Sequence, residues 1–468
     1  MTEILRQKLS DSRAARFMVL GVVALTMFCG YFITDVMAPL KQMLETEFGW
    51  NSSDYGFFTS AYGWFNVFLL MLIFGGIILD KMGVRFTGLG ACITMLVGCA
   101  LKYYAVAYGS GLEGTIFGVN TQVMLASLGF AIFGVGVEIA GITVTKVIVR
   151  WFKGHEMALA MGLQVSVARI GTTLALSGAI PIAKYFGNIS APILFGLALL
   201  CIGLIAYIVF CVMDKKLDAS IAETNETAEE PFKVSDILYI VKNKGFWLIA
   251  FLCVLFYSAV FPFLKYAVDL MINKYNIEPE FAGNIPAILP FGAILLTPLF
   301  GGIYDKKGKG ATIMMIGALL LIVVHALFAM PFLNVWWFAT ALMVLLGIGF
   351  SLVPSAMWPS VPKIIPENKL GTAYALIFWV QNWGLMGVPY LIGKILDKYC
   401  IIGTKKVMEE VTKNGVTEMV EKTITLYDYT LPMIIFTSFG VLALIVAFML
   451  KAEDKKKGYG LELPNIKK

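Results

Sequence analysis

The stretches FGGIILDKMGVR (residues 74–85) and FGGIYDKKGKG (residues 300–310) place one pattern at two distant points of the chain. Each contains an aspartate, Asp80 or Asp305, with a glycine four residues before it and another glycine three residues after it. A repeat at this spacing is typical of duplicated architectures. The two copies therefore predict two structurally related halves.

The repeated residues suit a conformational contact at the end of a membrane helix. Glycines allow two helices to approach closely, and an aspartate at a helix end can pair with a basic residue or a neighbouring helix N-terminus. Such a contact would hold one conformation and open in another, although a single copy could also be only a tight basic turn. The motif residues are Gly76, Asp80, Gly83, Arg85, Gly301, Asp305, Gly308 and Lys309.

The composition is that of a membrane protein. Of the 468 residues, 59% are hydrophobic and 15% are charged, whereas soluble domains contain about 25% charged residues. The seven cysteines form no CxxC pair, and the two histidines, His155 and His325, are far apart. We therefore expect no metal site and no other cofactor. The net charge of +6 is explained by membrane topology and indicates no nucleic-acid binding.

Twelve stretches are apolar enough to cross a lipid bilayer, which takes about 20 residues. Backbone groups in lipid must be satisfied internally, so these stretches are expected to be helices. We therefore predict an all-α membrane protein with twelve transmembrane helices in two six-helix bundles. The predicted spans are residues 17–39, 54–79, 85–107, 121–149, 157–183, 190–213, 246–271, 281–303, 310–331, 335–362, 369–393 and 428–450.

Basic residues set the expected orientation. Most of the 37 lysines and arginines fall on one side of the membrane if both termini are cytoplasmic, as the positive-inside rule requires. The longest polar segment on that side has the composition of a linker. The predicted parts are an N-terminal tail at 1–16, an N-terminal bundle at 17–213, a linker at 214–245, a C-terminal bundle at 246–450 with an extracytoplasmic insert at 394–427, and a C-terminal tail at 451–468.

The repeated motif, the twelve spans and the six-plus-six division resemble the major facilitator superfamily over the whole chain. This resemblance implies two bundles that rock around a binding site near the membrane midplane. It also implies that the first, fourth, seventh and tenth helices are central.

Two ionisable residues lie deep in the N-terminal half: Glu138 in GVGVEIAGITV and Arg169 in VSVARIG. The loop between their spans is short, so at a rise of 1.5 Å per residue both lie about 18–20 Å from the inner surface. A charge buried in a membrane faces a cavity or a partner. Two interpretations stay open. The residues form a structural ion pair, or Arg169 binds a substrate carboxylate and Glu138 an ammonium group.

The segment VEIAGITVTKVIVRWFKGHEMALAMGLQVSVARIG (residues 137–171) resembles one branch of the superfamily, the lysosomal dipeptide transporters. The resemblance implies dipeptide transport, with Glu138 and Arg169 at the positions that bind the peptide termini. Three features depart from the branch: the insert, Lys265 in place of a small residue, and an N-terminal tail without an acidic dileucine signal. They favour the plasma membrane of a microbe and leave an accessory subunit open.

Further candidates for the cavity wall lie near the span midpoints. Lys265 would contact a carboxylate in the outer vestibule or extend to the membrane surface. Asp35, at the outer end of the first span, is expected at a helix end or in a gate. The other candidate substrate-binding residues are Tyr62, Asn66, Tyr257, Trp358, Gln381 and Asn382.

We therefore predict a secondary active or facilitative transporter that works by alternating access, and not an enzyme. Its substrate would be a dipeptide or a similar small zwitterion such as an amino acid. An organic-anion carrier of the same superfamily would need Arg169 alone, and a non-transporting sensor would need an effector domain. Proton coupling would follow if Glu138 is protonated when substrate is absent.

Overall fold

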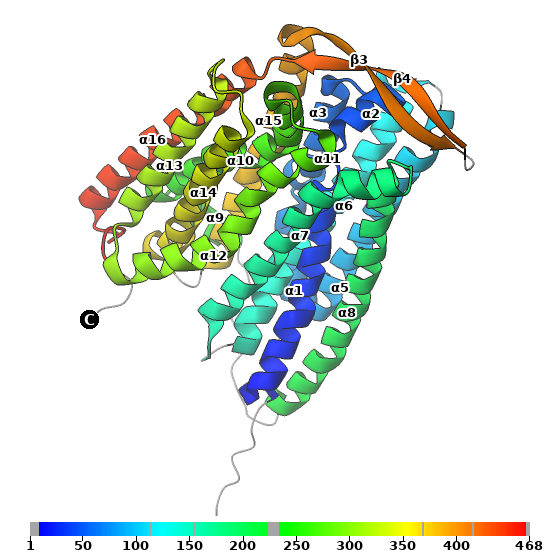
Figure 1. The fold of residues 1–468 in the computed structure, drawn as a ribbon. Coiled ribbons are helices and arrows are strands. Elements are labelled where there is room, and N and C mark those ends of the chain that lie inside the picture. Colours follow the sequence, from blue (N-terminus) through cyan, green and yellow to red (C-terminus); the bar gives the residue numbers. More distant parts are fainter. Residues whose placement is uncertain are drawn as a thin grey trace, which may run out of the picture.

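The computed structural model describes residues 9–112, 114–152, 155–222, 234–366, 369–413 and 416–464. Long helices form two groups that lie side by side, one from each half of the sequence (Figure 1). The N-terminal group contains α1 (Arg13–Asp35), α5 (Met71–Tyr108), α6 (Thr121–Phe152), α7 (Met157–Tyr185) and α8 (Ala191–Ala222). The C-terminal group contains α10 (Lys244–Tyr275), α12 (Asn284–Lys307), α13 (Gly310–Ala329), α14 (Trp336–Ile364), α15 (Leu370–Tyr399) and α16 (Thr430–Lys457).

Shorter elements connect these helices. In the N-terminal half they are η1 (Leu9–Asp11), α2 (Lys41–Phe48), α3 (Ser52–Ser60), η2 (Ala61–Gly63), α4 (Trp64–Phe68), η3 (Gly109–Gly111) and the strand pair β1 (Thr115–Ile116) and β2 (Val119–Asn120). In the C-terminal half they are α9 (Val234–Val241) and α11 (Pro279–Ala282). Within residues 214–245, the last turns of α8 and the whole of α9 are helical, and residues 223–233 lie outside the described part.

The second crossing differs from the continuous span expected at 54–79. By length and composition, 11 helices of the described residues could cross a membrane, and one of these is the 38-residue helix α5. Its backbone is non-helical at Gly83, where one membrane helix ends and the next begins. The second crossing is therefore built from α3, η2, α4 and the part of α5 before Gly83. Leu70, with a positive φ of 53°, precedes its last segment.

The two motif copies have related backbones. Gly83 has φ 76° and ψ 174°, and Gly308 has φ 69° and ψ −140°. Both conformations lie in a region that side chains with a Cβ rarely adopt. The repeat therefore keeps a glycine where the chain turns sharply between consecutive helices of each half.

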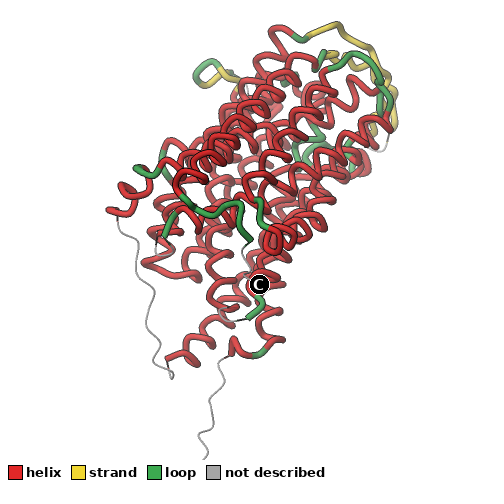
Figure 2. Tube along the Cα trace, turned by 90° about the vertical axis from the view of Figure 1, so that its left-hand side faces the viewer, coloured by secondary structure: helices red, strands yellow, loops and turns green. Residues whose placement is uncertain are grey.

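The insert at residues 394–427 contains an antiparallel hairpin. Its strands are β3 (Ile401–Lys413) and β4 (Val416–Tyr427), with a register irregularity between Ile401 and Gly403. The hairpin lies across one end of the bundle in two views at right angles (Figures 1 and 2). We call this the hairpin end, and we call the opposite end, where α1 begins and α16 ends, the termini end.

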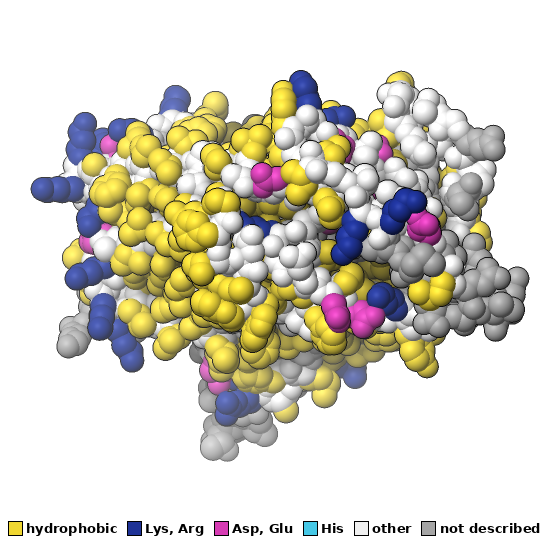
Figure 3. All heavy atoms as spheres, turned by 45° about the horizontal axis from the view of Figure 1, so that its top comes forward, with side chains coloured by type: hydrophobic (Ala, Val, Ile, Leu, Met, Phe, Trp, Pro, Cys, Tyr) yellow, Lys and Arg dark blue, Asp and Glu magenta, His cyan; other side chains and the backbone are white. Residues whose placement is uncertain are grey.

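The surface suits a lipid environment. Figure 3 shows a broad hydrophobic area on the left and in the centre of one face, with lysines and arginines along its left edge and beside acidic residues on the right. Many large apolar side chains are exposed, including Leu295 at 70% and Ile205 at 62%. Contiguous exposed apolar surface of this kind is rare in soluble monomers. The chain is therefore a multi-pass membrane protein.

Candidate functional site

A cavity of about 350 Å³ lies between the two halves. Both halves line it, with α1, α6 and α7 on one side and α10, α12, α14 and α15 on the other. Four of the residues that line it are charged: Asp35, Glu138, Arg169 and Lys265. In proteins built from two related membrane halves, binding sites lie at the interface of the halves, so this cavity is the candidate site.

Glu138 projects into the cavity from α6 and has a partner from each half. The Tyr62 hydroxyl donates a hydrogen bond of 2.7 Å to Glu138 Oε1. The Asn382 side chain of α15 is a second neutral polar neighbour of the carboxylate. Gly134, one turn before Glu138 on α6, gives Tyr62 room, because a Cβ on it would lie 2.2 Å from the Tyr62 carbonyl oxygen. The carboxylate is thus held in place by neutral donors.

Arg169 projects from α7 and is surrounded by aromatic rings. Its guanidinium carbon lies 5.3 Å from the ring centre of Tyr31, 5.4 Å from that of Phe261 and 5.1 Å from that of Phe350. A guanidinium over aromatic faces is stabilised by cation–π attraction. Among the described residues, no carboxylate lies within 4.0 Å of the guanidinium N–H groups.

The two interpretations of Glu138 and Arg169, a structural ion pair or a binding site, predict different distances between their charged groups. Glu138 and Arg169 line the same cavity, yet among the described residues no ion pair within 4.0 Å joins them. A structural ion pair would need direct contact to offset the cost of taking both charges out of water. Both charges therefore remain able to meet an added ligand.

Lys265 lines the cavity and does not extend to the membrane surface. Its ammonium group lies at the end of the cavity nearest the hairpin, 2.6 Å from Asp35 Oδ1 and 2.6 Å from the Thr34 carbonyl oxygen. Both side chains are mostly buried, with 13% of Lys265 and 11% of Asp35 exposed. Because α1 and α10 belong to different halves, this ion pair joins the two halves at the end of the cavity nearest the hairpin.

The other predicted site residues divide into two groups. Tyr62, Tyr257, Trp358 and Gln381 line the cavity, and the Trp358 indole donates to the Tyr257 hydroxyl at 3.2 Å. Asn66 and Asn382 are fully buried behind the wall. Asn66 donates to the Gly134 carbonyl at 3.3 Å and to Asn382 Oδ1 at 3.5 Å, so it supports the residues around Glu138 from the second crossing.

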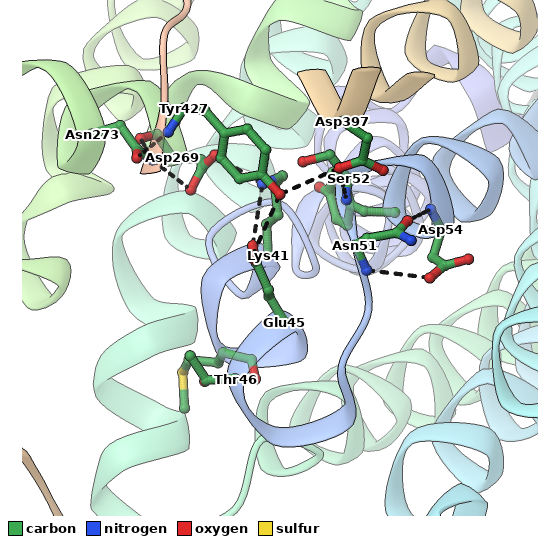
Figure 4. Close-up of polar contacts among 12 residues, drawn as sticks. Lys41, Glu45, Thr46, Asn51, Ser52, Asp54, Asp269, Asn273, Asp397 and Tyr427 are labelled. Carbon is green, nitrogen blue, oxygen red and sulfur yellow. Dashed lines mark hydrogen bonds and ion pairs between the residues drawn. The ribbon is translucent and has the colours of Figure 1, made fainter. Parts of the chain in front are cut away.

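A polar network closes the hairpin end (Figure 4). Lys41 of α2 and Asp269 of α10 form a buried ion pair at 2.9 Å, and the Tyr429 hydroxyl also donates to Asp269. Asp397 of α15 accepts from the backbone N–H groups of Ser52 at 3.0 Å and Ser53 at 2.5 Å. These N–H groups begin helix α3, where a carboxylate is favoured by the helix dipole.

The hairpin takes part in this network through Tyr427, the last residue of β4. Its ring lies 4.5 Å from the Lys41 ammonium, and its hydroxyl donates to Glu45 at 3.5 Å and to Asp397 at 3.4 Å. Its backbone N–H donates to Asn273 at 3.0 Å. The insert therefore belongs to the C-terminal half in sequence but also contacts α2 of the N-terminal half.

The first copy of the repeated motif makes its contacts inside the N-terminal half. Asp80 pairs with Lys146 of α6 at 2.5 Å. Arg85 pairs with Asp218 at 2.6 Å and with Asp214 at 3.4 Å, both on α8. The aspartate and arginine of the motif therefore have separate partners and are not bound to each other.

The second copy is covered by the C-terminal residues. The backbone N–H of Lys309 donates to the Glu462 carbonyl at 2.9 Å, and that of Gly310 donates to the Leu461 carbonyl at 2.9 Å. The Glu462 carboxylate accepts from Thr312 N–H at 2.9 Å. These N–H groups begin α13, so Glu462 occupies the position of an anion at a helix N-terminus.

Sequence reasoning missed three polar features. Lys102 of α5 is fully buried in the membrane region, donates to the Ile33 carbonyl at 3.2 Å and lies 4.8 Å from the Phe130 ring. The Lys41–Asp269 pair was also missed, because it joins residues 228 positions apart. The third is Lys146 of α6, which pairs with Asp80 of the motif. A lysine within an apolar run was the one available signal for Lys102.

Comparisons with known proteins agree with this geometry. The family model described as Major Facilitator Superfamily matches residues 23–389. The protein named lysosomal dipeptide transporter MFSD1 of Danio rerio is 29% identical over 395 residues, covering 82% of this chain and 81% of its own. The protein of that name from Homo sapiens is 29% identical over 397 residues, covering 82% of this chain and 80% of its own.

Two solved structures share the fold. A point mutant of the nucleoside transporter NupG has a TM-score of 0.67 at 15% identity, covering 93% of this chain and 99% of its own. A bacterial homolog of the human lysosomal transporter Spinster, inward-facing and unoccupied, has a TM-score of 0.66 at 14% identity, covering 95% of this chain and 98% of its own.

Proposed function

The chain belongs to the Major Facilitator Superfamily and is a transmembrane transporter that works by alternating access, and we propose that its substrates are dipeptides or similar small zwitterions. The observation that carries this proposal is the separation of Glu138 and Arg169 in one cavity between the halves. A zwitterion supplies an ammonium group for the first and a carboxylate for the second. The names of the relatives described above support the dipeptide class.

The proposed binding mode follows from the chemistry of each group. A guanidinium offers a planar fork of donors that fits a carboxylate with two parallel hydrogen bonds. The Glu138 carboxylate can accept from an ammonium group while it keeps the Tyr62 donor. Because Arg169 contacts rings from both halves and Glu138 has neighbours from both halves, a bound zwitterion would touch the whole interface. Substrate binding and the movement of the halves would then be linked.

The transport cycle would require that the contacts at the hairpin end break and re-form. In the present conformation the Lys41–Asp269 and Lys265–Asp35 pairs join the halves there. Opening toward the hairpin end would separate both pairs. The motif residues Asp80, Arg85, Asp305 and Lys309 would make corresponding changes at the termini end. We propose that this end faces the cytoplasm, because basic residues are in excess there.

Two finer proposals concern coupling and location. If Glu138 takes up a proton as substrate leaves, the carrier exchanges a proton for the substrate. Uptake is then driven by a pH gradient that is acidic inside, and Glu138→Gln removes that dependence. We also propose that the protein resides in the plasma membrane of a microbe, because Lys265 and the insert at residues 394–427 depart from the lysosomal branch. Fluorescence microscopy of the tagged full chain in its host tests the location.

The central test is uptake into proteoliposomes with a panel of radiolabelled dipeptides, single amino acids and organic anions. We expect saturable dipeptide uptake by the wild type and its loss in Arg169→Ala and in Glu138→Ala. Arg13→Ala, which changes an arginine whose side chain is 74% exposed, is the matched control and should transport normally. Normal uptake in both cavity variants would contradict the site. Transport of organic anions that survives Glu138→Gln would instead identify an anion carrier.

A further inference from the structure

The charged residues of the cavity wall balance one another. Two of the four are acids and two are bases, but they are arranged differently. Asp35 and Lys265 are in direct contact at 2.6 Å and neutralise each other. Glu138 and Arg169 have only neutral hydrogen-bonding or aromatic neighbours among the described residues. The charges of Glu138 and Arg169 are thus available to a ligand, whereas those of Asp35 and Lys265 neutralise each other.

Asp35 and Lys265 line the same cavity as Glu138 and Arg169. Thr34, Asp35 and Lys265 line the cavity together, at its end nearest the hairpin. Tyr31 lies one turn before Asp35 on α1 and contacts Arg169, and Phe261 lies one turn before Lys265 on α10 and contacts the same guanidinium. A substrate held by Arg169 therefore has the Asp35–Lys265 pair one helical turn away, about 5 Å along the helix axes.

Other charges nearby do not face the cavity. Lys102 lies behind α1, where its ammonium donates to the Ile33 carbonyl and contacts the Phe130 and Phe133 rings. The Lys41–Asp269 pair lies nearer the hairpin and is outside the cavity lining. The charges that a substrate side chain meets in the cavity are therefore those of Asp35 and Lys265.

We propose that Lys265, through its ion pair with Asp35, is a specificity-determining residue that makes the site select peptides with uncharged side chains. The proposal rests on the proposed dipeptide function. The termini of a dipeptide compensate Glu138 and Arg169, so a neutral side chain leaves the cavity without excess charge. A charged side chain would add a charge near a pair that is already neutral. In a poorly hydrated site an uncompensated charge is strongly disfavoured.

The proposal makes opposite predictions for the two partners. Lys265→Met leaves the Asp35 carboxylate uncompensated, so peptides with a cationic side chain gain relative to neutral ones. Asp35→Asn leaves the Lys265 ammonium uncompensated, so peptides with an acidic side chain gain instead. The double variant Lys265→Met/Asp35→Asn has no excess charge and regains the preference for neutral side chains. A purely structural contact would not change the sign of the preference.

The experiment measures uptake of Ala-Ala, Ala-Lys and Ala-Glu into proteoliposomes with the membrane potential clamped at zero. We expect the wild type to prefer Ala-Ala, Lys265→Met to raise the Ala-Lys to Ala-Ala ratio about tenfold, and Asp35→Asn to raise the Ala-Glu to Ala-Ala ratio about tenfold. Lys41→Met breaks another ion pair between the halves that does not line the cavity. It is the matched control and should change uptake of all three peptides by one common factor.

The outcomes separate this inference from the proposed function. Equal loss of all three peptides in Lys265→Met and Asp35→Asn would overturn the inference and assign the pair to a latch between the halves. A wild type that transports Ala-Lys or Ala-Glu as well as Ala-Ala would also overturn it, while dipeptide transport would stand. No uptake of any dipeptide by the wild type would overturn the proposed function and the inference together.

Discussion

Glu138 and Arg169 line one cavity from the neighbouring helices α6 and α7, but among the described residues each has its own partners and no ion pair joins them. Glu138 accepts from Tyr62, and Arg169 lies among three aromatic rings. The two charges are therefore positioned by the protein before a substrate arrives. Preorganised groups of this kind lower the cost of ordering the site on binding.

The Tyr62 hydroxyl is expected to contribute to substrate affinity through Glu138. Tyr62→Phe removes the 2.7 Å hydrogen bond to the carboxylate without changing the ring. A hydrogen bond to a charged group contributes about 1.5–3 kcal/mol. We therefore expect KM for a dipeptide to rise about tenfold or more in Tyr62→Phe. Kinetics of uptake in proteoliposomes measure this. Tyr239→Phe, at an exposed tyrosine outside the cavity, is the control, and equal KM values in the two variants would contradict the role of Tyr62.

Close helix packing at the hairpin end is expected to control the balance between conformations. A Cβ on Gly56 would lie 2.7 Å from the Pro389 carbonyl oxygen and 3.0 Å from Gly393 Cα, which belong to the other half. Gly56→Ala should disfavour this closed state by about 1–3 kcal/mol, the usual cost of overpacking. Distances between spin labels at the exposed residues Tyr108 and Tyr399 report the opening.

The control for this experiment is Gly90→Ala, because a Cβ on Gly90 would meet nothing within 4 Å. Spin-label distances should lengthen in Gly56→Ala and stay at wild-type values in Gly90→Ala. Distances that do not change in Gly56→Ala would show that the approach of α3 and α15 does not limit opening.

Much of the fold could be predicted from sequence because lipid imposes strong constraints. Apolar runs of sufficient length must be helical in a membrane, and the motif at Asp80 and Asp305 revealed the duplication. The break in the second crossing could not be predicted in this way. Residues 61–70 are as apolar as the rest of that crossing, so composition does not show where the helix ends.

The residues that line the candidate cavity could be predicted in part, for a similar reason. Glu138 and Arg169 stand out as isolated charges in apolar helices, and a short loop between their helices fixes their relative depth. The partners of Lys265 and Lys41 depend on contacts between distant residues, since Asp35 is 230 positions from Lys265. Only the folded structure brings such residues together.

Gly83 is expected to be required for its backbone conformation and not for space. With φ 76° and ψ 174° it lies in a region accessible almost only to glycine, so Gly83→Ala should destabilise the protein by about 1–3 kcal/mol. Gly76→Ala, in the same motif, should have little effect, because a Cβ there meets nothing within 4 Å. Thermal unfolding in detergent compares the two variants, and equal melting temperatures would contradict the argument.

Glu45 is expected to make the hairpin end sensitive to pH. Burial raises the pKa of Glu45 above its ordinary value of 4.5, although Lys41 lowers it in part, and Asp269 and Asp397 raise it further. The folded state then binds the Glu45 proton more tightly than the unfolded chain does. Its contribution to stability is therefore fully present below pH 4.5 and is lost as the pH rises through the raised pKa.

The comparison for this prediction is Glu45→Gln, which cannot titrate. We expect the variant to gain melting temperature relative to the wild type as the pH is raised from acidic toward neutral values. The two proteins should be most alike at low pH. A difference in melting temperature that is independent of pH would show that Glu45 does not titrate in this range.

The buried Lys41–Asp269 pair is expected to stabilise the closed hairpin end only as long as both partners are present. Lys41→Met leaves Asp269 with the Tyr429 hydroxyl and the Asn273 amide but without a counter-charge, and breaking a buried pair costs about 3–5 kcal/mol. Lys41→Met should therefore shift the spin-label distances toward the open state. The double variant Lys41→Met/Asp269→Leu should shift them back, because apolar residues of similar volume can replace a buried ion pair. If the double variant opens as far as Lys41→Met, the ion pair with Asp269 does not hold the hairpin end closed. The cation–π contact of Lys41 with Tyr427 then has this role.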